Sequence, residues 1–141
     1  MSDFPLWIEI PVRFRDVDGM RHVNNAVFFT YMEMARGAYW ERLGLGGDLD
    51  RLEFILARAE CDFRAPIPYG ETVRVGIRCS RIGSKSWDYE YRLEGVRDGT
   101  LFAEASSVQV YFDYARQRAE PIPAQVRQRI EELEVGGGSR G

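Results

Sequence analysis

The stretch that decides the fold is residues 12–36, VRFRDVDGMRHVNNAVFFTYMEMAR, where a polar, turn-rich segment leads into a helix. Residues 26–43 contain no proline and only one glycine, and large apolar side chains recur there at helical spacing. The stripe consists of Phe28, Tyr31, Met32, Ala35, Ala38 and Tyr39, widened by Val27, Met34 and Trp40. A helix that is apolar over most of its circumference is usually buried. Asn24 or Asn25 is expected to cap its start, and Gly44 with the glycines after it to end it.

Strand-like alternation of apolar and polar residues surrounds this helix. Residues 7–15 alternate, and Pro11 either weakens the prediction of a strand there or places that strand at a sheet edge. Further strands are expected at 53–65, 71–82, 86–96 and 100–113, the last two joined by a tight turn at Asp98-Gly99. Residues 123–134 indicate a short polar helix, and residues 136–141 a flexible tail. Strands joined by short turns pair antiparallel, so we expect an α+β fold in one domain, residues 1–135.

Composition excludes several classes of protein. The 141 residues carry a net charge of −3, which argues against a nucleic-acid-binding protein. The start has no secretory pattern and no apolar run approaches a membrane span, so we expect a cytoplasmic protein without a membrane partner. Cys61 and Cys79 are interpreted as core thiols, and with a single histidine they form no metal-ligand pattern. We therefore expect no metal and no cofactor.

Three motifs in order resemble those of one family. Residues 12–36, the segment DFRAPIPYGETVRV at 62–75 and the segment RIGSKSWDYEYRL at 81–93 together resemble the 4-hydroxybenzoyl-CoA thioesterase-like family. The resemblance spans roughly residues 8–123 and implies a hot-dog fold, an antiparallel sheet wrapped around one long central helix. It also implies acyl-CoA thioesterase activity. The chain departs from the family pattern at Arg21, where the family usually has glycine, so the turn there and the substrate preference are expected to differ.

The resemblance makes Asp18 the catalytic carboxylate. Thioester hydrolysis needs a carboxylate that attacks the carbonyl or activates a water, and the sequence leaves both roles open. Asn25 lies at the start of the helix, where free backbone N–H groups favour negative charge, so its N–H is the expected oxyanion donor. Such a donor contributes ~3 kcal/mol in other enzymes. For Asp16 we favour a structural hydrogen bond to backbone over a share in catalysis.

Other side chains are candidates for binding the substrate. His22, the only histidine, either touches the substrate or orients the loop. Lys85 and Ser86 lie in a turn that, by resemblance, contacts the nucleotide and phosphates of coenzyme A, and positive charge and hydroxyls suit phosphate oxygens. A solvated hairpin is the alternative interpretation of that turn. Three arginines are possible additions to a phosphate patch, at positions that the sequence does not place: Arg58, Arg64 and Arg81.

Two helix features have a structural interpretation. Glu33 is the position at which some other hot-dog thioesterases place a catalytic acid, but we favour a surface ion pair with Arg36, three residues on. Tyr31, Met34 and Tyr39 are predicted to pack in the core rather than to line an acyl tunnel.

Alternatives to an acyl-CoA thioesterase remain. One is a thioesterase for acyl groups on acyl carrier protein, and another is a non-catalytic acyl-CoA-binding module. A hot-dog dehydratase is disfavoured because such sites pair a histidine with a carboxylate in another motif order. One helix does not cover a sheet this rich in aromatic residues, so we expect a homodimer at least and a homotetramer as the final state.

Overall fold

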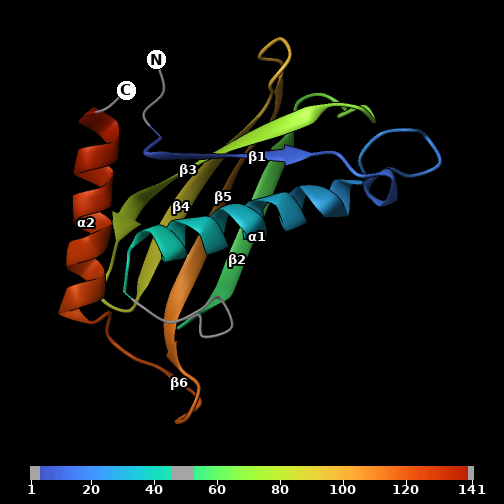
Figure 1. Cartoon of the computed structure of the whole chain (residues 1–141). Helices are drawn as coiled ribbons and strands as arrows, with labels where there is room; N and C mark the ends of the chain where they lie inside the picture. The colour runs from blue at the N-terminus through green and yellow to red at the C-terminus, as the bar shows by residue number, and fades with distance from the viewer. Residues whose placement is uncertain (1–3, 46–52, 140–141) are drawn as a thin grey trace.

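The computed structural model describes residues 4–45 and 53–139. The elements follow in the order β1 (Leu6–Pro11), a short 3-10 helix η1 (Phe14–Asp16), α1 (Asn25–Arg42), β2 (Phe54–Phe63), β3 (Thr72–Ile82), β4 (Ser86–Gly95), β5 (Leu101–Asp113), β6 (Arg118–Ala119) and α2 (Ala124–Ser139). One strand, one long helix and then a meander of strands is the order that the sequence predicts (Figure 1). The α+β class is therefore confirmed.

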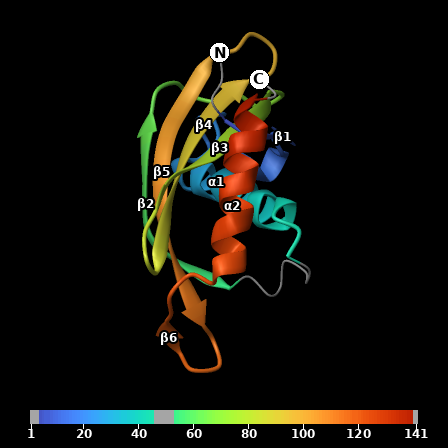
Figure 2. The same cartoon turned by 90° about the vertical axis from the view of Figure 1, so that its left-hand side faces the viewer.

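All strands belong to one antiparallel sheet. The order is β1-β3-β4-β5-β2, and β6 pairs with the end of β5. β1 is an edge strand, as Pro11 at its end predicts. β2 forms the opposite edge and pairs with β5 alone. Both helices lie on one side of the sheet, with α1 running across it (Figure 2).

The core lies between α1 and the inner face of the sheet. Alternate residues of β3 and β4 face the helix and are fully buried: Val73, Val75, Ile77, Trp87, Tyr89, Tyr91 and Leu93. Toward the end of α1, Trp40 stacks on Trp87 with ring centroids 6.1 Å apart, and Phe54 closes the cluster at 5.2 Å from Trp40. Aromatic rings bury large areas and pack with specific geometry, so this cluster holds the helix in place over the sheet.

Three features differ from the sequence prediction. The first strand ends at Pro11 instead of residue 15, because the Asp16 carboxylate accepts hydrogen bonds from Arg13 and folds residues 14–16 into η1. β6 has only two residues, too few to produce a periodic pattern. α2 continues to Ser139 and overlaps the expected tail from residue 136, since glycines weaken a helix by only about 1 kcal/mol each whereas proline breaks it. Residues 140–141, and Gly46 and Gly47 after α1, lie outside the described residues.

Candidate active site

A tight hairpin carries Asp18. Val17 and Val23 form an antiparallel bridge across it. Inside the bridge, the N–H of Asp18 donates to the carbonyl of His22 at 3.0 Å, and the N–H of Arg21 donates to the carbonyl of Asp18 at 2.9 Å. The Asp18 Oδ1 atom accepts a further bond from the N–H of Met20 at 2.9 Å. These bonds fix the position of Asp18 relative to the start of α1, which follows directly after the hairpin.

Arg21 takes the backbone conformation that glycine adopts freely. Its φ of 66° lies in the left-handed region, where a residue with a Cβ is strained by about 1–2 kcal/mol. The turn nevertheless closes through the bonds of Asp18 and Arg21 described above. The replacement of the family's glycine therefore changes the strain in this turn and leaves the turn closed.

Asp16 is a structural acid. Its side chain is only 2% exposed, and its carboxylate accepts bonds from the Arg13 side chain at 2.8 Å and the Tyr31 hydroxyl at 2.8 Å. Burial alone would raise the pKa of Asp16, but the hydrogen bonds from Arg13 and Tyr31 outweigh burial and hold that pKa below its usual value. The predicted backbone hydrogen bond of Asp16 is confirmed, since the carboxylate also accepts the N–H of Arg13 at 2.9 Å.

Asp18 has the opposite environment. Its side chain borders solvent, and within the described part of the chain its second carboxylate oxygen has no hydrogen-bond partner. It lines a pocket of about 430 Å³. The polar members of the lining are Asp18, His22, Asn24, Asn25 and Arg64. Apolar side chains, with Phe28 and Phe63 in edge contact at 4.9 Å, form the rest of the wall.

The start of α1 opens into the same pocket. Asn24 is the N-cap, and its side chain accepts the N–H of Ala26 at 2.8 Å, while the N–H of Val27 bonds to the Asn24 carbonyl. Among the described residues, the N–H of Asn25 has no hydrogen-bond partner. A free N–H at the positive end of an 18-residue helix is suited to an anionic oxygen. The pocket thus contains a free carboxylate oxygen and a free backbone donor.

His22 is joined to the neighbouring turn through its backbone. It forms an isolated bridge with Pro68, and its carbonyl accepts the N–H of Asp18. The residue is exposed and lines the pocket. Of the expected site residues, the structure therefore brings together Asp18, His22 and Asn25.

Lys85 and Ser86 lie elsewhere in the chain. The carbonyl of Lys85 accepts the N–H of Tyr111, and Tyr111 pairs with Phe54, at the end of β2 opposite Phe63. The pocket with Asp18 lies at the Phe63 end. α1, at ~1.5 Å per residue about 27 Å long, separates the two ends. One chain by itself does not bring these two groups together.

The remaining candidates separate into three groups. Arg64 lines the pocket and bonds to Glu104 at 3.3 Å. Arg58 and Arg81 pair with acids away from it, and Tyr31 and Tyr39 are fully buried, as expected of core residues.

The predictions that Met34 and the two cysteines pack in the core have different outcomes. The prediction for Met34 is wrong, because its side chain is 46% exposed. The thiols of Cys61 and Cys79 are free and half-buried against the core, in agreement with their interpretation as core thiols.

The expected surface pair of Glu33 and Arg36 is not formed among the described residues. Arg36 turns inward, is only 7% exposed, and donates to the Tyr91 hydroxyl at 3.2 Å. Tyr91 in turn bonds to the hydroxyl of Ser107. The correction follows from burial: an inward arginine on a helix packed against the sheet finds a phenol within reach, whereas the exposed Glu33 stays in water.

Sequence reasoning missed this buried polar chain. Ser107 donates to Gln109, and the Gln109 amide donates to the Trp87 carbonyl at 3.1 Å. The one available signal was that Ser107 and Gln109 share the face of β5 that also carries Tyr111, opposite the apolar Val108 and Val110. Because each of its side chains is hydrogen-bonded, this buried polar network fixes the middle of α1 on the sheet.

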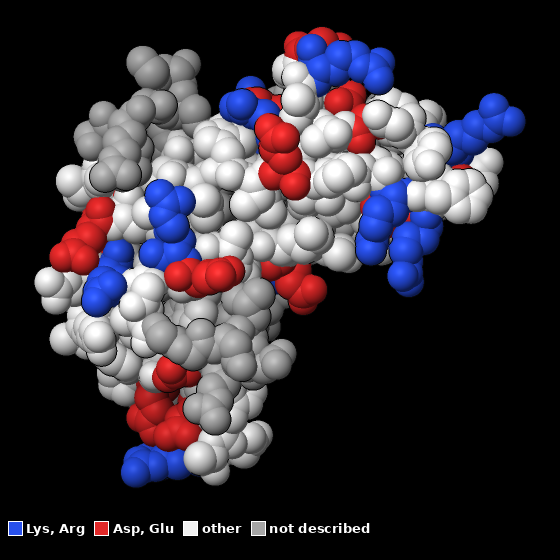
Figure 3. Space-filling view, in the orientation of Figure 1, with Lys and Arg blue, Asp and Glu red and all other residues white. Residues whose placement is uncertain are grey.

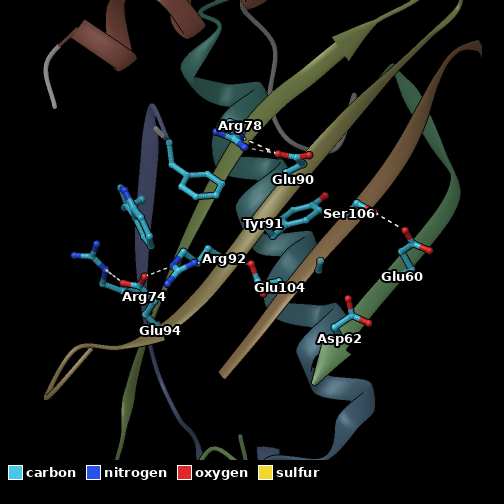
Figure 4. Close-up of a pocket in the computed structure, with 13 residues that line it drawn as sticks. Glu60, Asp62, Arg74, Arg78, Glu90, Tyr91, Arg92, Glu94, Glu104 and Ser106 are labelled. Atoms are coloured by element: carbon cyan, nitrogen blue, oxygen red, sulfur yellow. Dashed lines mark hydrogen bonds and ion pairs between the residues drawn. The ribbon is translucent and has the colours of Figure 1, made fainter. Parts of the chain in front are cut away.

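A second hollow, of about 770 Å³, lies on the outer face of the sheet (Figure 4). Its side chains pair with one another, as Arg78 does with Glu90 at 2.6 Å and Arg74 with Glu94 at 3.1 Å. The unlike charges sit on neighbouring strands and neutralise one another. The two features needed for thioester hydrolysis occur together in the smaller pocket instead.

Comparison with known proteins identifies the class. The family model described as the thioesterase-like superfamily matches residues 12–130. A thioesterase from Thermus thermophilus, solved with coenzyme A and zinc, is 38% identical and superimposes with a TM-score of 0.87, covering 96% of this chain and 98% of that one. The chain belongs to the thioesterase-like superfamily. The expected hot-dog fold and thioester hydrolase class are confirmed.

Two curated relatives are more distant. The uncharacterized protein YsmA of Bacillus subtilis is 29% identical over 105 residues, 74% of this chain and 71% of that protein. The long-chain acyl-CoA thioesterase FadM of Escherichia coli is 22% identical over 130 residues, 89% of this chain and 96% of that protein. Both alignments span most of the chain, as expected of one shared domain.

The Thermus structure contains zinc as well as coenzyme A. Among residues 4–45 and 53–139, no three His, Cys, Asp or Glu side chains are grouped in a way that could hold a metal ion. None of the helices described is long and apolar enough to cross a membrane.

Proposed function

We propose that the protein hydrolyses acyl-CoA thioesters, with Asp18 as the catalytic carboxylate and the N–H of Asn25 as an oxyanion donor. The observation that carries the proposal is that a free carboxylate oxygen and a free helix-start N–H line the same pocket. The relatives support the substrate class, because one was solved with coenzyme A and another is a long-chain acyl-CoA thioesterase.

Either of two steps is compatible with this arrangement. As a general base, Asp18 takes a proton from a water that attacks the carbonyl carbon; the C–S bond then breaks and the proton passes to the coenzyme A thiolate. As a nucleophile, Asp18 forms an acyl anhydride as the thiolate leaves, and water then cleaves the anhydride. In both routes the carbonyl oxygen becomes negative, and the N–H of Asn25 stabilises it.

The surroundings of Asp18 suit an anionic substrate. Arginine side chains are exposed at the end of the molecule that holds η1 and the start of α1 (Figure 3). Arg15 and Arg21 are exposed there, and neither forms an ion pair with another described residue. Coenzyme A carries several phosphate charges, so free guanidinium groups near the pocket favour its approach.

A second copy of the chain would complete the site. Four apolar side chains on β2 and α1 are 37–46% exposed and define a strip: Phe29, Met34, Leu56 and Phe63. A second chain related by a twofold axis covers the strip and pairs the two β2 edges antiparallel. The Phe54 end of β2 in the second chain then lies beside the Phe63 end of β2 and Asp18 in this chain. The turn of the second chain that contains its lysine comes with it. In such a dimer, Asp18 of one chain and Lys85 of the other can contact the same substrate molecule. A tetramer would contain two such dimers.

The carrier-protein alternative has one observation in its favour, namely the unpaired Arg15 and Arg21 beside the pocket, since carrier proteins are acidic. Thiol release from acyl-CoAs, compared with release from the same acyl groups on acyl carrier protein, separates these two substrates. A binding module without catalysis would retain coenzyme A esters and release no thiol from either.

A further inference from the structure

The turn from Gly83 to Ser86 is held rigidly by its backbone. The N–H of Gly83 donates to the Ser86 carbonyl at 2.7 Å, the Ser84 carbonyl accepts the N–H of Ile122 at 2.9 Å, and the Lys85 carbonyl accepts the N–H of Tyr111 at 2.8 Å. Lys85 itself remains exposed. The Ser86 hydroxyl accepts a hydrogen bond from the Arg81 guanidinium at 3.4 Å, whereas the Lys85 side chain has no partner among the described residues. A turn with a bonded backbone presents the Lys85 side chain from a fixed position, which favours binding.

Arg127 supplies the remaining backbone contact. This half-buried residue in the first turn of α2 donates from its guanidinium Nη2 to the Gly83 carbonyl at 2.7 Å. Two residues on, Arg129 makes an equivalent bond at 3.0 Å, but to the carbonyl of Leu43 at the end of α1. α2 therefore uses two similar arginines for different purposes: one holds the turn that carries Lys85, the other holds the end of a helix.

We propose that Arg127 is a positioning residue for coenzyme A binding, acting through the Gly83–Ser86 turn. The inference rests on the proposed function and on the expectation, drawn from the family resemblance, that Lys85 and Ser86 contact the nucleotide part of coenzyme A. A guanidinium hydrogen bond to a backbone carbonyl is charge-assisted and directional. Without it, the Gly83 carbonyl loses its partner and the segment before Lys85 is held by fewer bonds, so substrate binding has to order it further.

The kinetic test compares Arg127→Met with the matched control Arg129→Met. We expect the KM for an acyl-CoA to rise about tenfold in Arg127→Met with kcat nearly unchanged, and both constants to stay near wild type in Arg129→Met. With an acyl-pantetheine, which lacks the nucleotide, Arg127→Met should match wild type. An equal rise of KM in both variants, or a rise that persists with acyl-pantetheine, overturns the proposal. Arg127→Lys, which keeps a donor, should recover part of the affinity.

A double-mutant cycle separates positioning from direct contact. If Arg127 acts through the turn, Arg127→Met has little further effect on KM once Lys85→Ala is present. Independent, additive effects would mean that Arg127 touches the substrate itself, and would overturn the positioning role.

Lys85 also offers a readout that does not depend on activity. It is the only lysine in the chain, so an amine-reactive reagent modifies it and the N-terminus alone. Coenzyme A should protect Lys85 in wild type and in Arg129→Met, and protect it less in Arg127→Met. Equal protection in all three proteins contradicts the proposal while leaving the thioesterase function intact. Absence of thiol release by wild type contradicts the function itself.

Discussion

The Tyr31 hydroxyl donates to the Asp16 carboxylate at 2.8 Å, which ties the loop before the site to the middle of α1. Removing the donor in Tyr31→Phe leaves a buried carboxylate with one bond fewer, so we expect a loss of about 2 kcal/mol in the free energy of unfolding. Urea denaturation of both proteins measures the difference. An unchanged midpoint would show that the bond contributes nothing.

The same carboxylate predicts a pH dependence. Because the pKa of Asp16 is lower in the folded than in the unfolded protein, its stabilisation is present above its ordinary pKa. That stabilisation is lost as the pH falls through the depressed value. Asp16→Asn should be less stable than wild type at neutral pH, and the gap should narrow in acid. A gap that stays constant from neutral pH down through the carboxylate range would contradict this assignment.

Arg21 predicts a stabilising substitution. Arg21→Gly removes the left-handed strain from the folded state, which stabilises the protein. It also gives the unfolded chain more conformational freedom, which cancels part of that gain. We therefore expect a net rise of roughly 0.5–1 kcal/mol in the free energy of unfolding. Arg21→Ala, which keeps the strain and also removes the guanidinium, is the control and should not be stabilised. If both variants unfold at the same urea concentration, the left-handed conformation carries no cost.

The rings of Tyr39 and Tyr89 are in contact, with their centroids 4.7 Å apart, but their hydroxyl groups differ in hydrogen bonding. The Tyr39 hydroxyl donates to Glu134 at 2.6 Å, whereas the buried Tyr89 hydroxyl has no partner among the described residues. Tyr39→Phe should therefore lose about 2 kcal/mol of unfolding free energy, and Tyr89→Phe should lose little or gain up to about 1 kcal/mol. Thermal unfolding of the two variants tests this, and equal destabilisation would contradict it.

The strip of Phe29, Met34, Leu56 and Phe63 predicts that one substitution abolishes both assembly and activity. Leu56→Glu places a charge in the proposed interface and should yield a folded monomer with little thioesterase activity. Val96→Glu is the control, because Val96 is equally exposed but lies in the β4–β5 turn. Light scattering at micromolar concentration gives the mass, and a Leu56→Glu protein that remains a full-size active oligomer would place the interface elsewhere.

The sequence predicted the parts that depend on local patterns. The helix and the four long strands follow from periodicity, and capping rules place the helix start at Asn24 or Asn25, of which Asn24 is the N-cap. Asp18, His22 and Asn25 come together because they are close neighbours in a short segment that leads into one helix. Local chemistry determines such features, and so a single sequence reveals them.

Long-range contacts determine what the sequence did not predict. Arg36 pairs with Tyr91, 55 residues away, where helix spacing indicated Glu33. The sequence made both Lys85 and Asp18 site candidates without placing them relative to each other, and the pairing of β5 with β2 puts Lys85 at the other end of the fold. Met34 is exposed because α1 presents it away from the sheet, and its partner is expected to be another chain. No pattern within one element indicates these partners.

The most direct measurement is thiol release from short, long and aromatic acyl-CoAs by wild type, Asp18→Asn and Glu33→Gln. Asn can still accept the N–H of Met20, so Asp18→Asn should fold normally, yet it should lose about 100-fold or more in kcat. Glu33→Gln should retain the wild-type rate, because Glu33 is exposed on α1 and does not line the pocket. Equal rates for wild type and Asp18→Asn, or a loss confined to Glu33→Gln, would contradict the assignment of Asp18 as the catalytic carboxylate.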